Sequence, residues 1–321
     1  MAIPNSSFTE LASVTLAKYS SKIFDNVTDH LPVLYYLKQA GNAGTVSVDG
    51  GTQILENLEY GENASFQWYS GYDVLSVTPS DVITSAAYDW KQCNANVIFN
   101  GREVAINSGK EKIFDLIQTK RKNAEKTITN NMGAALYYAG TESDGKAIGG
   151  LQLLVADAPT TGTVGGINRA TQSWWRNQIY DLSVETVTIS SSTILSSMNG
   201  LWRRCVRNSD QPKLVVMGDT YHGYWEAALQ ANQRFQEAKE ANVGFVYQMY
   251  KGAKVLYDPN CADERLYMLN TDYLKLKSHK DVNMKVGVAR HPTNQDATVI
   301  PISWMGNLTS SQSSVLGVMH A

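Results

Sequence analysis

The sequence has few of the residues that metal sites and disulfide frameworks require. Its 321 residues include three cysteines and five histidines. Cys93, Cys205 and Cys261 are far apart and form no Cys-x-x-Cys pair, so we expect neither a structural zinc site nor a disulfide framework. No histidine has a second histidine or a cysteine three to five positions further on. We therefore expect no bound metal and three reduced thiols in a protein assembled in cytosol.

Signals for membrane insertion and for common enzyme classes are also missing. No run approaches the roughly 20 apolar residues of a membrane span, and the first ten residues lack the pattern of a signal peptide. The glycines at 149–150 and 162–166 do not fit a phosphate-binding loop, and no Gly-x-Ser-x-Gly elbow occurs. We expect no catalytic residue and no cofactor, so the sequence predicts a protein that is not an enzyme.

The charge is nearly balanced, with 28 basic and 30 acidic residues and a net charge of -2. Proteins that hold nucleic acid tightly carry a basic stripe or tail, so at most weak, non-specific contact with DNA is expected. The one basic concentration lies on the polar side of a long helix predicted from about 110 to 138. It is either a solvated face with weak ion pairs or a surface turned toward nucleic acid. Its members are Lys112, Lys120, Arg121, Lys122 and Lys126.

Periodicity predicts a mixed α+β protein with a protruding arm. Residues 8–39 have a helical pattern, and residues 45–100 resemble a long two-stranded excursion with a loop near its middle. The long helix follows, and beyond it the pattern predicts alternating elements. We expect helices at 191–207 and 219–229, and strands at 214–217, 245–257, 265–269, 273–277 and 297–304.

Aromatic residues are abundant, with 17 Tyr and 7 Trp. Four of them cluster where the excursion turns: Phe66, Trp68, Tyr69 and Tyr72. Tyrosine and tryptophan are enriched at protein interfaces because they offer a large rigid surface with a polar tip. These four are either ordinary core residues or contacts to a neighbouring subunit. We favour the second interpretation, because an isolated two-stranded arm has little core of its own.

Two segments resemble the major capsid proteins of tailed bacteriophages. They are residues 112–145, which contain the long helix, and residues 148–177. The second is the more specific, with Gly-Gly-Leu-Gln at 149–152, Pro-Thr-Thr-Gly-Thr-Val-Gly-Gly at 159–166 and Trp-Trp-Arg-Asn at 174–177. The rest of the chain agrees in layout. The resemblance implies the Hong Kong 97-type capsid fold.

The resemblance also implies a division of the chain. We expect an N-terminal arm at 1–43, an E-loop at 44–100, and a P-domain with its spine helix at 101–140. An A-domain should occupy 141–275, and strands over 276–321 should return through the P-domain to the A-domain. The implied function is that of a major capsid protein, which assembles in the bacterial host cytoplasm through pentamers and hexamers into the icosahedral shell around double-stranded DNA.

Two alternatives stay open: an encapsulin-type bacterial compartment shell, and an aromatic-rich glycan-binding surface protein. Besides copies of itself, the partners that the resemblance implies are a portal, a separate scaffolding protein and a cement or decoration protein. A separate scaffold is expected because the arm and E-loop occupy the chain before the spine helix. In the namesake of this fold, a lysine on the E-loop forms a covalent link to a neighbouring subunit. We expect no such cross-link here, because Lys91 is the one lysine between residues 45 and 100 and lies well beyond the turn.

Overall fold

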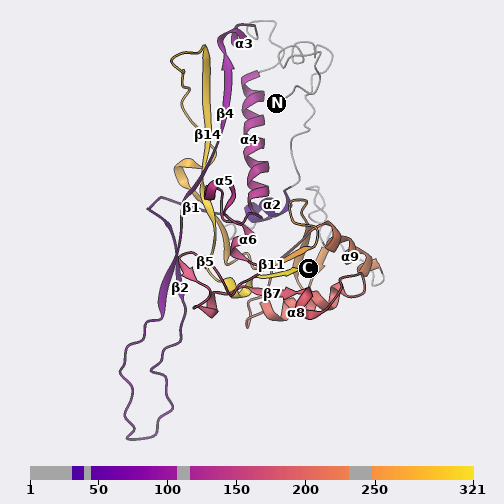
Figure 1. The fold of residues 1–321 in the computed structure, drawn as a ribbon. Coiled ribbons are helices and arrows are strands. Elements are labelled where there is room, and N and C mark those ends of the chain that lie inside the picture. Colours follow the sequence, from indigo (N-terminus) through magenta and orange to yellow (C-terminus); the bar gives the residue numbers. More distant parts are fainter. Residues whose placement is uncertain (1–30, 40–44, 107–115, 231–247) are drawn as a thin grey trace.

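The long helix packs along two extended strands to form an elongated strut. The computed structural model describes residues 31–39, 45–106, 116–230 and 248–321. Within these, α4 (Leu116–Ala135) lies along β4 (Lys91–Asn100), which pairs antiparallel with β14 (Ala297–Ser310) over ten residues (Figure 1). Ala124, Ile128 and Met132 recur at four-residue steps and are buried. This spacing places them on one face of the helix, toward the strands.

β14 is the centre of a five-stranded sheet. It pairs on its other side with β12 (Leu274–His279) and β13 (Lys285–Val286), and β12 pairs in parallel with β1 (Thr45–Val48). β1 and β12 are more than 220 positions apart in the chain, so the segment that leads into the arm is fixed by the C-terminal strands.

The second sheet forms a lobe at the base of the strut. Its centre is β8 (Leu214–Met217), where all four residues are buried, as expected for a strand covered on both faces. Helices α8 (Ile194–Cys205) and α9 (Asp219–Gln230) pack with it through a core that includes Met198, Trp202 and Trp225. The strand order is β7 (Gln178–Asp181), β15 (Gly317–His320), β11 (Arg265–Leu269), β8 (Leu214–Met217), β10 (Ala253–Tyr257) and β9 (Gln248–Tyr250).

Shorter elements complete the described chain. Helix α2 (Pro32–Gln39) buries Val33, Leu34 and Leu37 in the main core. The helical elements are α2 (Pro32–Gln39), α3 (Gly101–Ile106), α5 (Glu142–Gly145), α6 (Leu151–Leu154), α7 (Leu182–Glu185) and the 3-10 turns η4 (Ser173–Trp175), η6 (Lys280–Val282) and η7 (Ser313–Val315). Two ladders stand apart from the sheets: β2 (Ile54–Glu59) with β3 (Ile83–Tyr88), and β5 (Thr163–Val164) with β6 (Ile167–Asn168).

Gly150 joins the strut to the lobe. Its amide donates to the Tyr138 carbonyl at 3.0 Å, and the next amide, of Leu151, donates to the Leu136 carbonyl at 2.6 Å. A Cβ atom at position 150 would lie 2.5 Å from the Leu136 carbonyl oxygen and 2.6 Å from the Tyr138 nitrogen. Only glycine fits, because the backbones are in direct contact. This contact accounts for the second glycine of the Gly-Gly-Leu-Gln motif.

The predicted elements are largely confirmed, with two corrections. The described part of the long helix ends at Ala135 rather than near 138, since the chain turns there to meet Gly150. The excursion over 45–100 is not one continuous two-stranded arm. β1 and β4 pair with β12 and β14, and only β2 and β3 pair with each other. The predicted helix before residue 31 and the start of the long helix lie outside the described residues.

We predict that Gly150→Ala lowers the free energy of unfolding by about 2 kcal/mol or more, because the new methyl group overlaps backbone atoms that cannot move aside. Chemical denaturation of the purified subunit measures this. The control is Gly223→Ala in α9, where a Cβ atom would meet no atom within 4 Å. This change should be neutral or stabilise by up to about 1 kcal/mol, as alanine favours helix. If Gly150→Ala and Gly223→Ala change the free energy of unfolding equally, the close backbone contact at Gly150 is contradicted.

Candidate functional site

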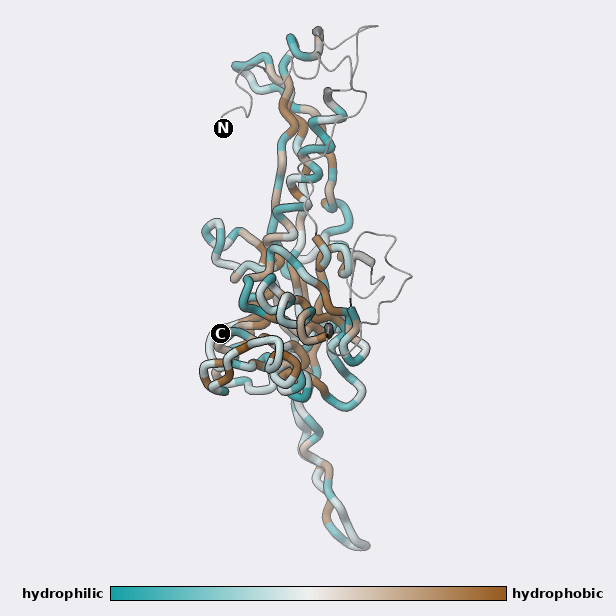
Figure 2. Tube along the Cα trace, turned by 90° about the vertical axis from the view of Figure 1, so that its right-hand side faces the viewer, coloured by the Kyte–Doolittle hydropathy of each residue, from teal (hydrophilic) through white to brown (hydrophobic). Residues whose placement is uncertain are grey.

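A long loop extends away from the body on the side opposite the strut (Figures 1 and 2). It begins where the β2–β3 ladder ends, at the pair Glu59 and Ile83, and residues 60–82 contain no helix or strand. Loops of more than about 15 residues without secondary structure are uncommon in compact domains and are often functional. We call residues 60–82 the arm loop.

The four aromatic residues singled out in the sequence all lie on the arm loop and are exposed. Trp68 is 91% exposed and Tyr72 is fully exposed, so they are not core residues. Val74, Leu75 and Val77 on the returning side are exposed as well. An apolar surface of this kind marks an interaction site in a soluble protein. That these residues contact a neighbouring subunit stays a prediction.

Together, the β2–β3 ladder and the arm loop form the arm, and a buried ion pair holds the base of this arm to the strut. Lys277 Nζ lies 2.9 Å from Glu56 Oε1, and both side chains are only about a tenth exposed. The Thr309 hydroxyl donates to the same carboxylate oxygen at 2.7 Å, and Lys277 also donates to the Leu55 carbonyl at 3.3 Å. β2 is thereby joined to β12 and β14 at once. Sequence reasoning missed this pair, because nothing local marks one lysine of β12 as buried.

A second buried bond joins β3 to β14. The Tyr88 hydroxyl donates to the Ser310 carbonyl at 2.9 Å, and the Tyr88 side chain is buried. Burial raises the pKa of Tyr88 well above its ordinary value, so the hydroxyl keeps its proton and remains a donor.

The β5–β6 hairpin supports the arm from the lobe side. The Ala87 amide donates to the Gly165 carbonyl at 2.9 Å. Gly165 has φ +59, and a Cβ atom there would lie 2.8 Å from the Ala86 side chain, which accounts for a glycine in the Pro-Thr-Thr-Gly-Thr-Val-Gly-Gly motif. At the start of the arm loop, the Tyr60 ring stacks on Trp174 with centroids 5.6 Å apart. The Pro-Thr-Thr-Gly-Thr-Val-Gly-Gly and Trp-Trp-Arg-Asn motifs therefore both contact the base of the arm.

The predicted basic face of the long helix is not one continuous surface. Lys120 turns toward β4 and α3, where it pairs with Glu103 at 3.3 Å and donates to the Ile98 carbonyl. Arg121 pairs with Glu125 at 2.9 Å along the helix. Lys122 is exposed, and Lys126 is half-buried. Lys112 lies outside the described residues. A role of this face toward DNA stays a prediction.

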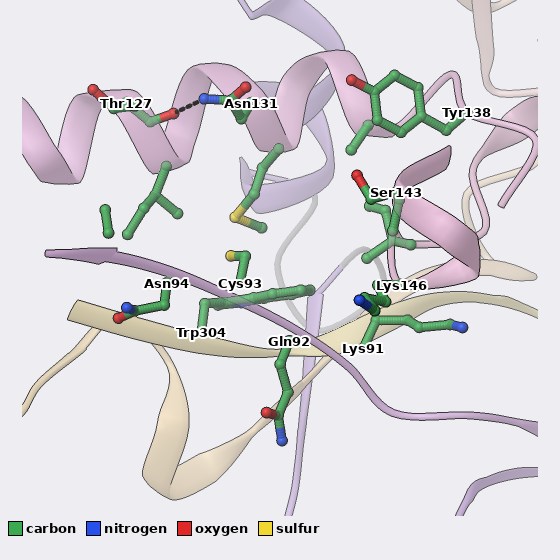
Figure 3. A pocket seen from close by; sticks show the side chains of 16 residues that line it. Lys91, Gln92, Cys93, Asn94, Thr127, Asn131, Tyr138, Ser143, Lys146 and Trp304 are labelled. Carbon is green, nitrogen blue, oxygen red and sulfur yellow. Dashed lines mark hydrogen bonds between the residues drawn. The ribbon is translucent and has the colours of Figure 1, made fainter. Parts of the chain in front are cut away.

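A cavity of about 320 Å³ lies between α4 and β4 (Figure 3). Cys93, Met132 and Trp304 contribute to it, and burial raises the pKa of the Cys93 thiol. Lys91, at its edge, donates to the Gly145 carbonyl at 2.5 Å. The residues lining this cavity include no Asp, Glu or His.

Within the described ranges, no group of three or more His, Cys, Asp and Glu side chains could hold a metal ion. No helix in that part of the chain has both the length and the apolar character to cross a membrane. The features that stand out are therefore a protruding apolar loop and the contacts that anchor it.

Solved shell proteins share this architecture over nearly the whole chain. The capsid asymmetric unit of cyanophage A-1(L) matches with a TM-score of 0.69 at 16% identity, covering 94% of this chain and 95% of that one. The capsid of Myoviridae phage XM1 matches with a TM-score of 0.59 at 10% identity, covering 94% and 95%. The holo-SrpI encapsulin complex from Synechococcus elongatus PCC 7942 matches with a TM-score of 0.58 at 9% identity, covering 98% and 95%.

No family profile and no curated protein sequence matches the chain. The structural matches define the fold: it is the α+β Hong Kong 97-type capsid fold that the sequence resemblance implies.

We predict that Lys277→Met lowers the free energy of unfolding by about 3 kcal/mol, since it leaves Glu56 buried without its partner. Denaturant unfolding gives the value. Arg121→Ala is the matched control, because it removes an exposed ion pair within one helix and should cost less than about 1 kcal/mol. If Lys277→Met costs no more than the control, the pair does not hold the base of the arm.

Proposed function

We propose that this chain is a major capsid protein, which assembles through pentamers and hexamers into the icosahedral shell around the double-stranded DNA of a tailed phage. The observation that carries the proposal is the match to capsid subunits over 94% of the chain and almost the full length of each. In this role the protein is structural and not an enzyme. Its location is the virion shell, with assembly in the cytoplasm of the bacterial host.

The exposed arm loop supports assembly. Burial of its apolar side chains against a partner would stabilise the complex by roughly 25 cal/mol for each Å² of apolar surface removed from water. The free subunit lacks this stabilisation, because these side chains are exposed. In a shell the partner is a second copy of the chain. Under this proposal the N-terminal arm (1–43), E-loop (44–100), P-domain (101–140), A-domain (141–275) and returning strands (276–321) are the working divisions.

The encapsulin-type compartment is the second candidate, because the fold also matches an encapsulin complex. The two proposals differ in cargo: a phage shell encloses DNA, and a compartment encloses protein. A portal, a separate scaffolding protein and a cement protein are partners only of the phage shell. Analysis of the contents of purified particles decides between them. The glycan-binding alternative lacks a comparable observation in its favour.

Assembly tests the proposal directly. We expect the purified subunit, alone or with its scaffolding protein, to form pentamers, hexamers, tubes or closed shells in negative-stain images and in sedimentation. Trp68→Ala with Tyr72→Ala should leave circular dichroism unchanged and impair assembly, because both side chains are exposed in the free subunit. Val288→Ala, which removes an exposed apolar side chain outside the arm loop, should assemble normally.

Two results would count against this proposal. A stable monomer at high concentration, with and without scaffold, would contradict the assembly function. Global unfolding of the Trp68 and Tyr72 double variant would contradict the assignment of these aromatics to a contact surface.

We also expect mature shells to hold together without covalent links between subunits. Cross-linking of the kind known from the namesake of this fold needs a lysine amine on the arm loop, and residues 60–82 contain no lysine. Lys91 opens β4 and is engaged by the Gly145 carbonyl. Boiled, denatured particles should give one band at monomer mass on a gel, whereas a ladder of pentamer and hexamer masses would contradict this.

A further inference from the structure

The arm loop has a defined shape although it has almost no backbone ladder. Beyond the Tyr60 amide, which donates to the Val82 carbonyl at 2.9 Å, its two sides are joined by side chains. Neither sheet covers it, and its apolar residues point into solvent. Its conformation therefore depends on the polar side chains that bridge it.

Asn63 ties the two sides together near the base. Its Oδ1 accepts from the Ser65 amide at 3.0 Å, from the Ser65 hydroxyl at 2.8 Å, and from the Ser80 hydroxyl at 3.2 Å. Ser65 is on the outgoing side and Ser80 is on the returning side. One acceptor atom thus gathers donors from both sides.

Gln67 and Asp73 shape the tip. Gln67 Nε2 donates to the Val74 carbonyl at 3.0 Å, which spans the loop a second time. Asp73 Oδ2 accepts from the Ser70 amide at 2.7 Å, and the Asp73 amide donates back to the Ser70 carbonyl at 3.1 Å. Gly71 between them has φ +52, a conformation that glycine adopts readily.

These bonds satisfy polar groups across the loop and leave the apolar side chains pointing away from it. Phe66 and Trp68 lie edge to face with centroids 5.6 Å apart, so even the exposed rings have a fixed relation to each other. A loop that is already shaped loses less conformational entropy when it docks than one that must order at that moment.

We propose that Asn63, Gln67 and Asp73 are positioning residues, which hold the arm loop in its docking shape before assembly so that it binds a second copy of this chain as a preformed element. This inference deepens the proposed capsid function and rests on it for the identity of the partner. The shape of the free loop, however, can be measured without any assembly.

Two substitutions that add the same charge distinguish the loss of a hydrogen bond from an effect of charge alone. Asn63→Asp keeps the Oδ1 acceptor that all three donors use, so it should preserve the bridge. Gln67→Glu removes the amide donor to Val74 and should break the second bridge. Each adds one negative charge and changes shape little. Asn63→Ala removes the first bridge, and Ser76→Ala is a control at an exposed loop serine for which the structure shows no side-chain bond.

The first measurement uses the unassembled subunit. Chymotrypsin cleaves after aromatic residues, and exposed flexible loops are cleaved fastest. We expect cleavage at residues 66–72 to be about threefold to tenfold faster in Asn63→Ala and Gln67→Glu, the effect of losing roughly one or two net hydrogen bonds. Asn63→Asp and Ser76→Ala should match the unchanged protein, and all five proteins should melt at the same temperature.

The second measurement is the protein concentration at which assembly begins. It should rise about threefold to tenfold in Asn63→Ala and Gln67→Glu and stay unchanged in Asn63→Asp and Ser76→Ala. Equal cleavage of all variants would overturn the proposal, and so would equal impairment of Asn63→Asp and Gln67→Glu, which would indicate a charge effect. If the unchanged protein does not assemble, the capsid function fails, while the cleavage rates still decide whether the bridges shape the loop.

Discussion

A protruding arm of two neighbouring chain segments cannot be stabilised by hydrophobic burial alone, because both of its faces are open to water. Here this constraint is met in two places. At the base, β2 and β3 bury Ile54, Leu58 and Ala86 in the main core. Toward the tip no core is available, and side-chain hydrogen bonds connect the two sides of the arm loop instead.

The anchoring contacts come from parts of the chain that are remote in sequence. Lys277, Thr309 and Ser310 reach the arm from β12 and β14, and Gly165 reaches it from the β5–β6 hairpin. The same two strands form the strut with α4. The arm is therefore attached both to the five-stranded sheet and to the β5–β6 hairpin.

Much of this architecture is predictable from the sequence, because it rests on local patterns. β8 coincides with its predicted apolar run, and α8 and α9 begin and end within about three residues of their predicted bounds. The exposed position of the arm aromatics follows from the absence of a core around a glycine-punctuated excursion. The resemblance to phage capsid proteins gave the fold where periodicity alone gave only a mixed α+β class.

What could not be predicted depends on partners far away in the chain. Periodicity places Lys120 on a polar helix face, but only the packing of α4 on β4 turns it toward Glu103. A lysine in an alternating strand is normally solvated, and Lys277 is buried only because Glu56 arrives from another ladder. Asn63 and Gln67 resemble ordinary loop residues until the fold of the loop brings Ser80 and Val74 beside them.

The charges of the arm restrict how copies can meet. Glu59, Glu62, Asp73 and Asp81 lie at or within the arm loop, and residues 59–82 contain no Lys, Arg or His. With a formal net charge of -2 for the whole chain and -4 for this segment, the remainder carries +2, since -2 minus -4 is +2. Two arms placed against each other would bring acidic groups together, whereas the rest of another copy carries a small formal net charge of opposite sign.

This difference bears on the kind of assembly that can form. Contact between two identical arms is self-complementary and stops at a dimer, whereas an arm on a different surface of the next copy leaves that copy's own arm free. Repeated from copy to copy, the second arrangement closes a ring where the rotations between copies add up to a full turn, and otherwise it forms an open filament. The acidic residues disfavour the first arrangement, and the apolar side chains between them reward whichever contact excludes water. The charge of this short loop thus disfavours contact between two arms, while burial of its apolar side chains stabilises either arrangement.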